Sequence, residues 1–125
     1  MRATGLGVIL ALSLLLTGCS GGSAALNAEQ MAGGSVLNGQ HLVYGYGCGT
    51  CHVIPGIAEA SGTVGPSLQG FASRVYIAGS TTNEPEHLIQ WITDPQKVVP
   101  GNAMPNLGVT KEQARQIAAF LYTLR

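Results

Sequence analysis

Five consecutive residues constrain this chain more than any other feature. Cys48 and Cys51 are separated by two residues and His52 follows directly, giving Cys48-Gly49-Thr50-Cys51-His52. On a single helical turn both sulfurs reach neighbouring positions and the imidazole projects beside them. The fold must therefore bring two thiols and one imidazole to one place, where they can hold a metal-containing group or form a redox dithiol.

The spacing C-x-x-C-H is that of covalent c-type haem attachment, in which both thiols form thioether bonds to haem vinyl groups and the histidine binds iron. The alternatives are a redox dithiol, half of a zinc site and a disulfide. Zinc needs four ligands, and a thioredoxin-like site needs alternating strands and helices that this sequence does not predict. One covalent haem c with its iron is the predicted cofactor, attached through Cys48, Cys51 and His52.

The second axial ligand is predicted in a loop near the C-terminus. Residues 100–108 contain two prolines and two glycines, a composition that cannot form a regular helix. Met104 lies within this loop, where ligation explains a thioether better than the filling of a core gap does. Thioether ligation raises the reduction potential of haem iron relative to harder ligand sets. The sequence thus predicts His52 and Met104 as the two iron ligands.

His41 and His87 leave a bis-histidine arrangement as an alternative. His41 precedes the motif too closely in sequence to cross easily to the opposite haem face. His87 lies in the first turn of a predicted helix whose apolar stripe is formed by Leu88, Trp91 and Ile92. It is therefore expected to face solvent. We interpret both as surface histidines.

The N-terminus has the pattern of a targeting segment. Arg2 precedes an apolar run over residues 6–16, which is shorter than the roughly 20 apolar residues that span a bilayer but suits a signal peptide. The run ends in Leu16-Thr17-Gly18-Cys19, which resembles the lipobox of bacterial lipoproteins. An ordinary signal peptide with an incidental cysteine is the alternative. We predict a signal peptide over residues 1–18, a lipid on Cys19, and a location in the bacterial cell envelope, anchored on the extracytoplasmic side of a membrane.

Composition and small residues set the expected domain organisation. The small polar residues 20–25 and the pair Gly33-Gly34 predict a flexible tether over residues 19–34, followed by one domain over residues 35–125. The formal net charge is zero and no basic run occurs, which excludes a nucleic-acid-binding surface. Only 6% of the residues are aromatic, so a buried cofactor is expected to supply part of the core.

The periodicity of apolar residues predicts an all-α domain. Helices are expected over residues 36–46 and 86–93, the second ended by Asp94-Pro95. Thr110 and Gln113 form the pattern of a capping box at the start of a final helix. The core face of that helix repeats every three or four positions, at Ala114, Ile117, Ala118 and Leu121.

These features together resemble a class I cytochrome c from about Gly39 to the C-terminus. Gly39 and Tyr44 resemble the small and aromatic positions of the family's first helix, and residues 120–122 resemble the aromatic-rich final helix that it crosses. The resemblance implies short helices and loops wrapped around one covalently bound haem. It also implies an electron carrier rather than an enzyme.

The resemblance assigns further residues to the haem. Gly65-Pro66-Ser67-Leu68 is similar to the family's G-P-x-L loop, which implies that the Pro66 carbonyl accepts the Nδ1 proton of His52 and that Leu68 packs on haem. Arg74 and Trp91 become candidates for contact with the haem propionates. The alternatives are a surface charge for Arg74 and a core aromatic for Trp91.

One subgroup is especially similar over residues 74–79, 88–95 and 103–108: the cytochrome c domain attached to subunit II of some haem-copper oxidases. No copper-site cluster of cysteines and histidines precedes the haem motif, so we expect a protein separate from subunit II. The expected function is one-electron transfer in a respiratory chain, by a monomer that docks transiently on a membrane-bound haem-copper oxidase. The alternatives are an electron-accepting partner of a dehydrogenase, a haem-based sensor of gases or small molecules, and a peroxidase-like enzyme.

Overall fold

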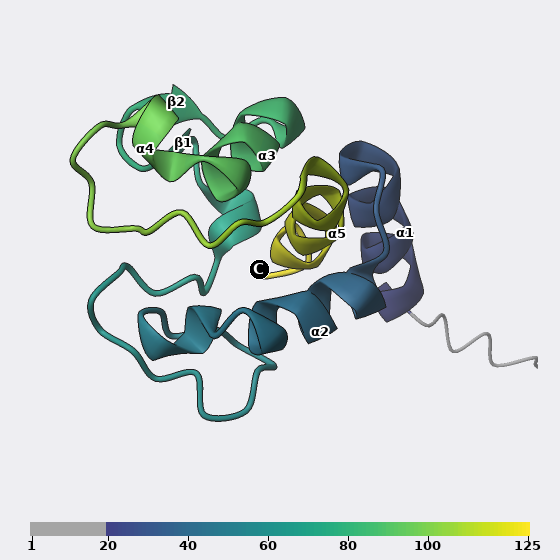
Figure 1. Ribbon diagram of the computed structural model, residues 1–125. Helices are drawn as coiled ribbons and strands as arrows, with labels where there is room; N and C mark the ends of the chain where they lie inside the picture. Colours follow the sequence, from purple (N-terminus) through teal and green to yellow (C-terminus); the bar gives the residue numbers. More distant parts are fainter. Residues whose placement is uncertain (1–19) are drawn as a thin grey trace, which may run out of the picture.

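The computed structural model describes residues 20–125 and shows a mainly helical domain (Figure 1). The predicted signal peptide and Cys19 lie outside the described residues. The elements are α1 (Ser20–Ala32), α2 (Val36–Gly45), the 3-10 turns η1 (Cys48–Thr50) and η2 (Phe71–Ser73), β1 (Tyr76–Ile77), β2 (Thr81–Thr82), α3 (Pro85–Thr93), α4 (Pro95–Val98) and α5 (Lys111–Leu121). Within residues 20–125, no helix is both long enough and apolar enough to cross a membrane.

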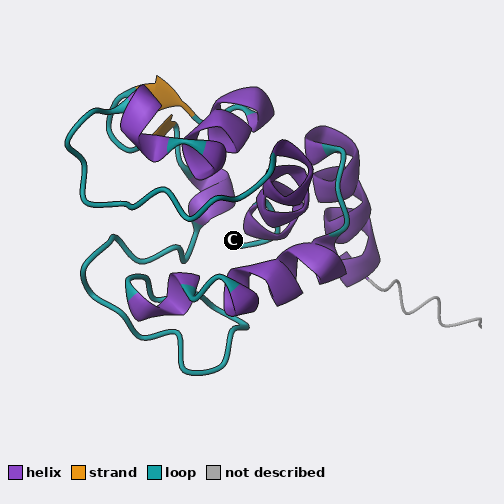
Figure 2. Ribbon diagram, viewed as in Figure 1, coloured by secondary structure: helices purple, strands orange, loops and turns teal. Residues whose placement is uncertain are grey.

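The all-α prediction is confirmed, with one small sheet that the sequence did not predict (Figure 2). Strands β1 and β2 pair antiparallel, with Tyr76 opposite Thr82 and Ile77 opposite Thr81. The helices expected over residues 36–46 and 86–93 correspond to α2 and α3. Each strand has only two residues, too few to show the alternation by which a strand is recognised in a sequence.

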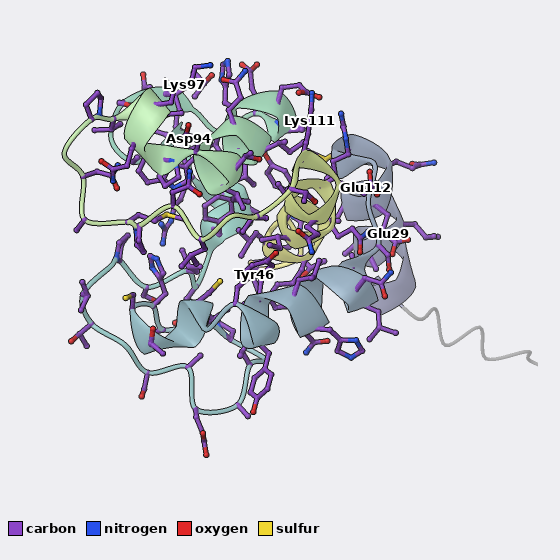
Figure 3. All side chains as sticks on the ribbon, in the orientation of Figure 1. Glu29, Tyr46, Asp94, Lys97, Lys111 and Glu112 are labelled. Atoms are coloured by element: carbon purple, nitrogen blue, oxygen red, sulfur yellow. The ribbon has the colours of Figure 1, made fainter. Side chains whose placement is uncertain are left out.

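The centre of the fold is the crossing of α2 over α5. Gly39 is buried at the crossing, where a Cβ atom would lie 1.9 Å from the carbonyl oxygen of Gln116. Near the end of α2, the Tyr46 hydroxyl donates to Oε1 of Gln113 at 2.8 Å (Figure 3). Tyr44, which resembles the aromatic position of the family's first helix, is 65% exposed. Tyr46, two residues later, makes the contact with α5.

Helix α5 begins and packs as its sequence predicts. Thr110 Oγ1 accepts from the Gln113 N–H at 3.2 Å, and Gln113 Oε1 accepts from the Thr110 N–H at 3.0 Å. This reciprocal capping box satisfies donors that would otherwise be unpaired at the start of the helix. All four predicted core residues of α5 are buried, namely Ala114, Ile117, Ala118 and Leu121.

The prediction of a flexible tether is wrong for residues 20–32, which form helix α1. Ala28 and Ala32 are buried where α1 packs against α5. Gly34 continues this close approach, since a Cβ atom there would lie 2.6 Å from the backbone of Arg115. Alanine has the highest helix propensity and its small side chain lets helices approach closely. The Ser-Gly content at the start of the segment concealed both effects.

Candidate functional site

The predicted haem-attachment residues lie on one tight turn that follows α2. Gly47 has a left-handed backbone (φ 69°) that glycine adopts without strain and that redirects the chain into η1. The N–H groups of Cys51 and His52 both donate to the Cys48 carbonyl, at 3.2 and 3.1 Å. Cys48 and Cys51 are partly buried free thiols. The turn therefore presents two sulfurs and an imidazole from five consecutive residues.

Burial also affects the chemistry of one thiol. It raises the pKa of Cys48 above its usual value, with a smaller contribution from the neighbouring Cys51. Before any bond forms at its sulfur, Cys48 therefore stays protonated at neutral pH. Thr50 also supports the turn, because its hydroxyl donates to the Gly47 carbonyl at 2.8 Å.

The imidazole of His52 is held by the backbone of the following loop. Its Nδ1 lies 2.7 Å from the Pro66 carbonyl oxygen, the contact that the G-P-x-L resemblance implies. Because a carbonyl oxygen only accepts, Nδ1 must carry the proton and Nε2 keeps a free lone pair for a metal. Gly65 allows this approach, since a Cβ atom there would lie 2.3 Å from Cε1 of His52.

The loop over residues 53–70 folds back along the haem motif. The Gly65 N–H donates to the Cys51 carbonyl, and the Leu68 N–H donates to the Val53 carbonyl, both at 2.8 Å. These backbone bonds fix the loop on either side of Pro66. The position of the carbonyl that holds His52 is thus set by the motif itself.

Met104 lies in a loop whose backbone is organised by two amide side chains. The Met104 N–H donates to Oδ1 of Asn102 at 2.7 Å, and Nε2 of Gln96 donates to the Met104 carbonyl at 2.9 Å. Nδ2 of Asn102 also donates to the Val99 carbonyl at 2.7 Å. Sequence reasoning did not assign Gln96 or Asn102 to the site. A loop rich in proline and glycine leaves backbone groups without regular partners. Amide side chains in or near such a loop could therefore have been predicted to bind its backbone.

The donor set fits a haem c: two free thiols on one turn, an imidazole with a free Nε2, and a thioether in a constrained loop. A sequence model of the family described as Cytochrome c matches residues 36–125. The chain belongs to the cytochrome c family. Members of this family bind a covalent haem c with iron, and Cys48 and Cys51 fit the attachment motif. It is therefore an electron-transfer haem protein.

Two curated relatives show where this cytochrome c lies within its family. It is 35% identical over 79 residues to cytochrome c oxidase subunit 2 of Alkalihalophilus pseudofirmus, covering 62% of this chain and 22% of the relative. It is 30% identical over 87 residues to cytochrome c oxidase subunit 2 of Bacillus sp. (strain PS3), covering 66% of this chain and 24% of the relative. The chain thus spans less than a quarter of either relative. No solved structure matches.

The other residues predicted for this cytochrome occupy different environments. The Arg74 guanidinium donates to the Ser67 carbonyl and lies 5.5 Å from the ring centre of Phe71, so it adjoins the loop that holds His52. Leu68 and Trp91 are half-buried and packed against the hydrophobic core. Haem contact by Leu68 and propionate contact by Arg74 and Trp91 stay predictions.

The remaining histidines of the cytochrome lie on α2 and α3. His41 is exposed on α2. His87 is half-buried, with Nδ1 2.9 Å from the hydroxyl of Thr82 in β2. His87, which was expected to face solvent, is partly exposed, and this contact also joins the first turn of α3 to the hairpin.

Proposed function

We propose that this cytochrome c is a one-electron carrier on the extracytoplasmic side of a membrane, where it passes electrons of a respiratory chain to a terminal oxidase. The observation that carries the proposal is the 2.7 Å contact between His52 Nδ1 and the Pro66 carbonyl beside the attachment turn. This contact orients His52 Nε2, the imidazole nitrogen left free to bind iron. An electron carrier needs no catalytic group beside that nitrogen.

Each residue of the site has a role in holding the cofactor. Cys48 and Cys51 would attach the haem, and His52 Nε2 and the Met104 thioether would bind its iron. Haem held in this way supplies a metal centre that gains and loses one electron without making or breaking a substrate bond. The Pro66 carbonyl fixes the imidazole tautomer and makes His52 a stronger donor.

The backbone around Met104 limits movement of the second ligand. Gln96 and Asn102 bind the Met104 carbonyl and N–H from both sides, so the thioether is presented from a fixed backbone. A fixed ligand favours a carrier over a sensor, because a sensor has to vacate an iron position for its gas.

A haem-copper oxidase is the proposed electron acceptor, because both curated relatives are cytochrome c oxidase subunit 2 proteins. The segments that hold the haem carry little charge: residues 98–110 contain no Asp, Glu, Lys or Arg, and residues 42–73 contain only Glu59. Steering by surface lysines is therefore weak, and docking depends on apolar contact around the haem edge.

The lipid on Cys19 is proposed to keep the protein at the membrane that holds the oxidase. Two or more acyl chains give stable attachment without a spanning helix. Mass spectrometry of the mature protein tests this directly, since lipidation adds the acyl mass to a chain beginning at Cys19. A mature chain that begins elsewhere without added acyl mass contradicts it.

Visible and near-infrared spectra of the holoprotein test the ligand set. Met104→Ala should abolish the weak near-infrared band of sulfur–iron ligation while leaving the haem covalently bound, and ferrous Met104→Ala should bind CO rapidly. Met31→Ala is the matched control, because Met31 is exposed on α1. An unchanged spectrum in Met104→Ala removes this residue as a ligand, and rapid CO binding by the unaltered protein favours a sensor.

Oxidation of the ferrous protein by membranes with and without a haem-copper oxidase tests the acceptor. We expect rapid oxidation only with the oxidase present, and only a modest decrease in rate as salt is added. A rate that collapses with salt contradicts the uncharged docking surface. Reduction by a dehydrogenase without any transfer to the oxidase contradicts the proposed acceptor.

A further inference from the structure

Helix α1 is an addition to the cytochrome domain that is built into its core. The family match begins at residue 36, after α1 has ended. Ala28 and Ala32 of α1 are 2% and 1% exposed, and a Cβ atom at Gly34 would lie 2.6 Å from the backbone of Arg115. The contact with α5 therefore continues from α1 into the connection that follows it.

The end of α1 is also fixed to the start of α2. The Gly33 N–H donates to the Glu29 carbonyl at 2.8 Å, which closes the last turn of α1. The Glu29 carboxylate accepts from the Val36 N–H at 2.8 Å, at the first residue of α2 (Figure 3). A carboxylate at a helix N-terminus is favoured by the helix dipole. Helix α1 is thus held by two helices.

Two leucines are exposed beside this junction. Leu26 lies one turn before Glu29 on α1, and Leu37 follows Val36 on α2; they are 62% and 61% exposed. A shallow groove at this junction is lined by Leu26, Glu29, Gln30, Gly33, Gly34 and Ser35. Residues 20–37 contain a single charged residue, Glu29, and its carboxylate is already bonded. We call Leu26 and Leu37 the leucine pair.

The first turns of α1 and α2 lie far from the loops that carry the predicted haem ligands. In Figure 1 the first turn of α1 and the first turn of α2 share the lower right corner, and the loops over residues 53–70 and 99–110 lie on the opposite side. Cys19 directly precedes the first residue of α1. A lipid on Cys19 would therefore be joined to α1 with no flexible linker between the bilayer and the helix.

We propose that α1 is a rigid mount which seats the leucine pair in the lipid interface and holds the haem residues on the side away from the bilayer. The inference rests on the lipid anchor proposed above. Exposed leucines gain free energy by leaving water for the acyl boundary. With the lipid and two apolar side chains at one corner, the domain has a fixed orientation, and a flexible tether would give none.

Spin labels on the full-length lipidated holoprotein test this orientation. Labels are placed through Leu26→Cys and Leu37→Cys, with Val75→Cys as the control because Val75 is also exposed, at 68%, and lies next to the hairpin. The protein is reconstituted in vesicles of phosphatidylglycerol and phosphatidylcholine. At positions 26 and 37, accessibility to oxygen should rise and accessibility to a water-soluble nickel chelate should fall. Position 75 should not change.

A second variant tests whether position 26 is protected because α1 is packed rigidly on α5, or only because the lipid holds α1 near the bilayer. Gly34→Ala places a methyl group against the Arg115 backbone and should loosen α1 from α5, which should restore nickel accessibility at position 26 while the haem spectrum is retained. Gly22→Ala is the matched control, since a Cβ atom there meets nothing within 4 Å.

The outcomes distinguish this proposal from the anchor on which it rests. Protein retained by vesicles with positions 26 and 37 still open to nickel overturns the mount and leaves the anchor intact. Protection that appears only when an oxidase is present in the vesicles also overturns it, because the occupant is then a protein. Protein that is not retained by vesicles overturns the anchor and the mount together.

Discussion

The two ends of the molecule are held together in different ways. At the end formed by α1, α2 and α5, buried alanines and Gly39 let helices approach closely, and backbone bonds lie within the helices. At the other end, residues 47–70 and 95–108 are mostly loops, fixed by single bonds such as those of Asn102 and the Pro66 carbonyl. The helical end is specified by its own packing, whereas the loop end is shaped to receive a cofactor.

The two ends also differ in how much free energy their contacts contribute to stability. Burial stabilises by roughly 25 cal/mol per Å² of apolar surface and acts collectively over the helical end. Each hydrogen bond of the loop end contributes a net stabilisation of about 1 kcal/mol. Changes at the helix crossing should therefore affect the whole fold, and changes in the loops should affect the iron ligands first.

The largest effect is expected for Gly39→Ala at the helix crossing. The added Cβ atom would lie 1.9 Å from the Gln116 carbonyl oxygen, so α2 and α5 must separate. We expect a loss of about 3 kcal/mol in unfolding free energy, measured by guanidinium unfolding of the holoprotein. Gly45→Ala is the control, because a Cβ atom there meets nothing within 4 Å. Equal losses in both variants would show that the crossing is not close-packed.

Asn102→Ala tests the loop end at its second ligand. The change removes the acceptor of the Met104 N–H and a donor to the Val99 carbonyl, so roughly 1–3 kcal/mol of local stability should be lost. The near-infrared band should weaken and ferrous CO binding should accelerate. Asn106→Ala is the control in the same loop, since its Oδ1 accepts from Gly108. Equal loss of the band in the two variants would contradict a specific role for Asn102.

Tyr122→Phe probes the place where the helical end meets the hairpin. Burial, with a smaller contribution from Glu84, raises the pKa of Tyr122 to about 12. Because the pKa of Tyr122 is higher in the folded than in the unfolded protein, the fold keeps its full stability below about pH 10. It loses stability as the pH rises toward 12 and Tyr122 ionises. The loss across this window should be roughly 2–3 kcal/mol.

The variant should behave differently on either side of this window. Below pH 10, Tyr122→Phe should be about 1 kcal/mol less stable, because the Tyr122 hydroxyl no longer donates to Asn83. Between pH 10 and 12, its unfolding free energy should fall less than that of the unaltered protein. Parallel curves from urea unfolding across this range would show that Tyr122 ionises equally in both states.

The smallest effect is expected for Glu86→Gln on the surface where α3 meets the helical end. Glu86 forms ion pairs with Lys111 at 3.6 Å and Arg115 at 3.5 Å, joining α3 to α5, and its side chain is 60% exposed. Exposed pairs contribute little, so the loss should be below about 0.5 kcal/mol and should vanish in high salt. A larger loss in thermal unfolding would mean that charge, besides packing, holds α3 against α5.

The sequence predicts the features that depend on local spacing. The capping residues Thr110 and Gln113 and the core stripe of α5 follow from residues three or four apart, and the attachment turn follows from a motif of five residues. Helix α1 was not predicted, because its stability comes from α5, far away in the chain. The roles of Gln96 and Asn102 were also missed, since a hydrogen bond to a loop backbone leaves no periodic pattern.

The contact between Tyr46 and Gln113 has a consequence for the order of folding. It joins residues 67 positions apart, and the same Gln113 oxygen also accepts from the Thr110 N–H that starts α5. Helix initiation and long-range closure therefore share one side chain, so we expect the start of α5 and its contact with α2 to form in a coupled way during folding. Because α2 cannot pack against α5 before Gln113 and its neighbours have folded, we expect the two thiols of the attachment turn to stay accessible for haem attachment until α5 forms.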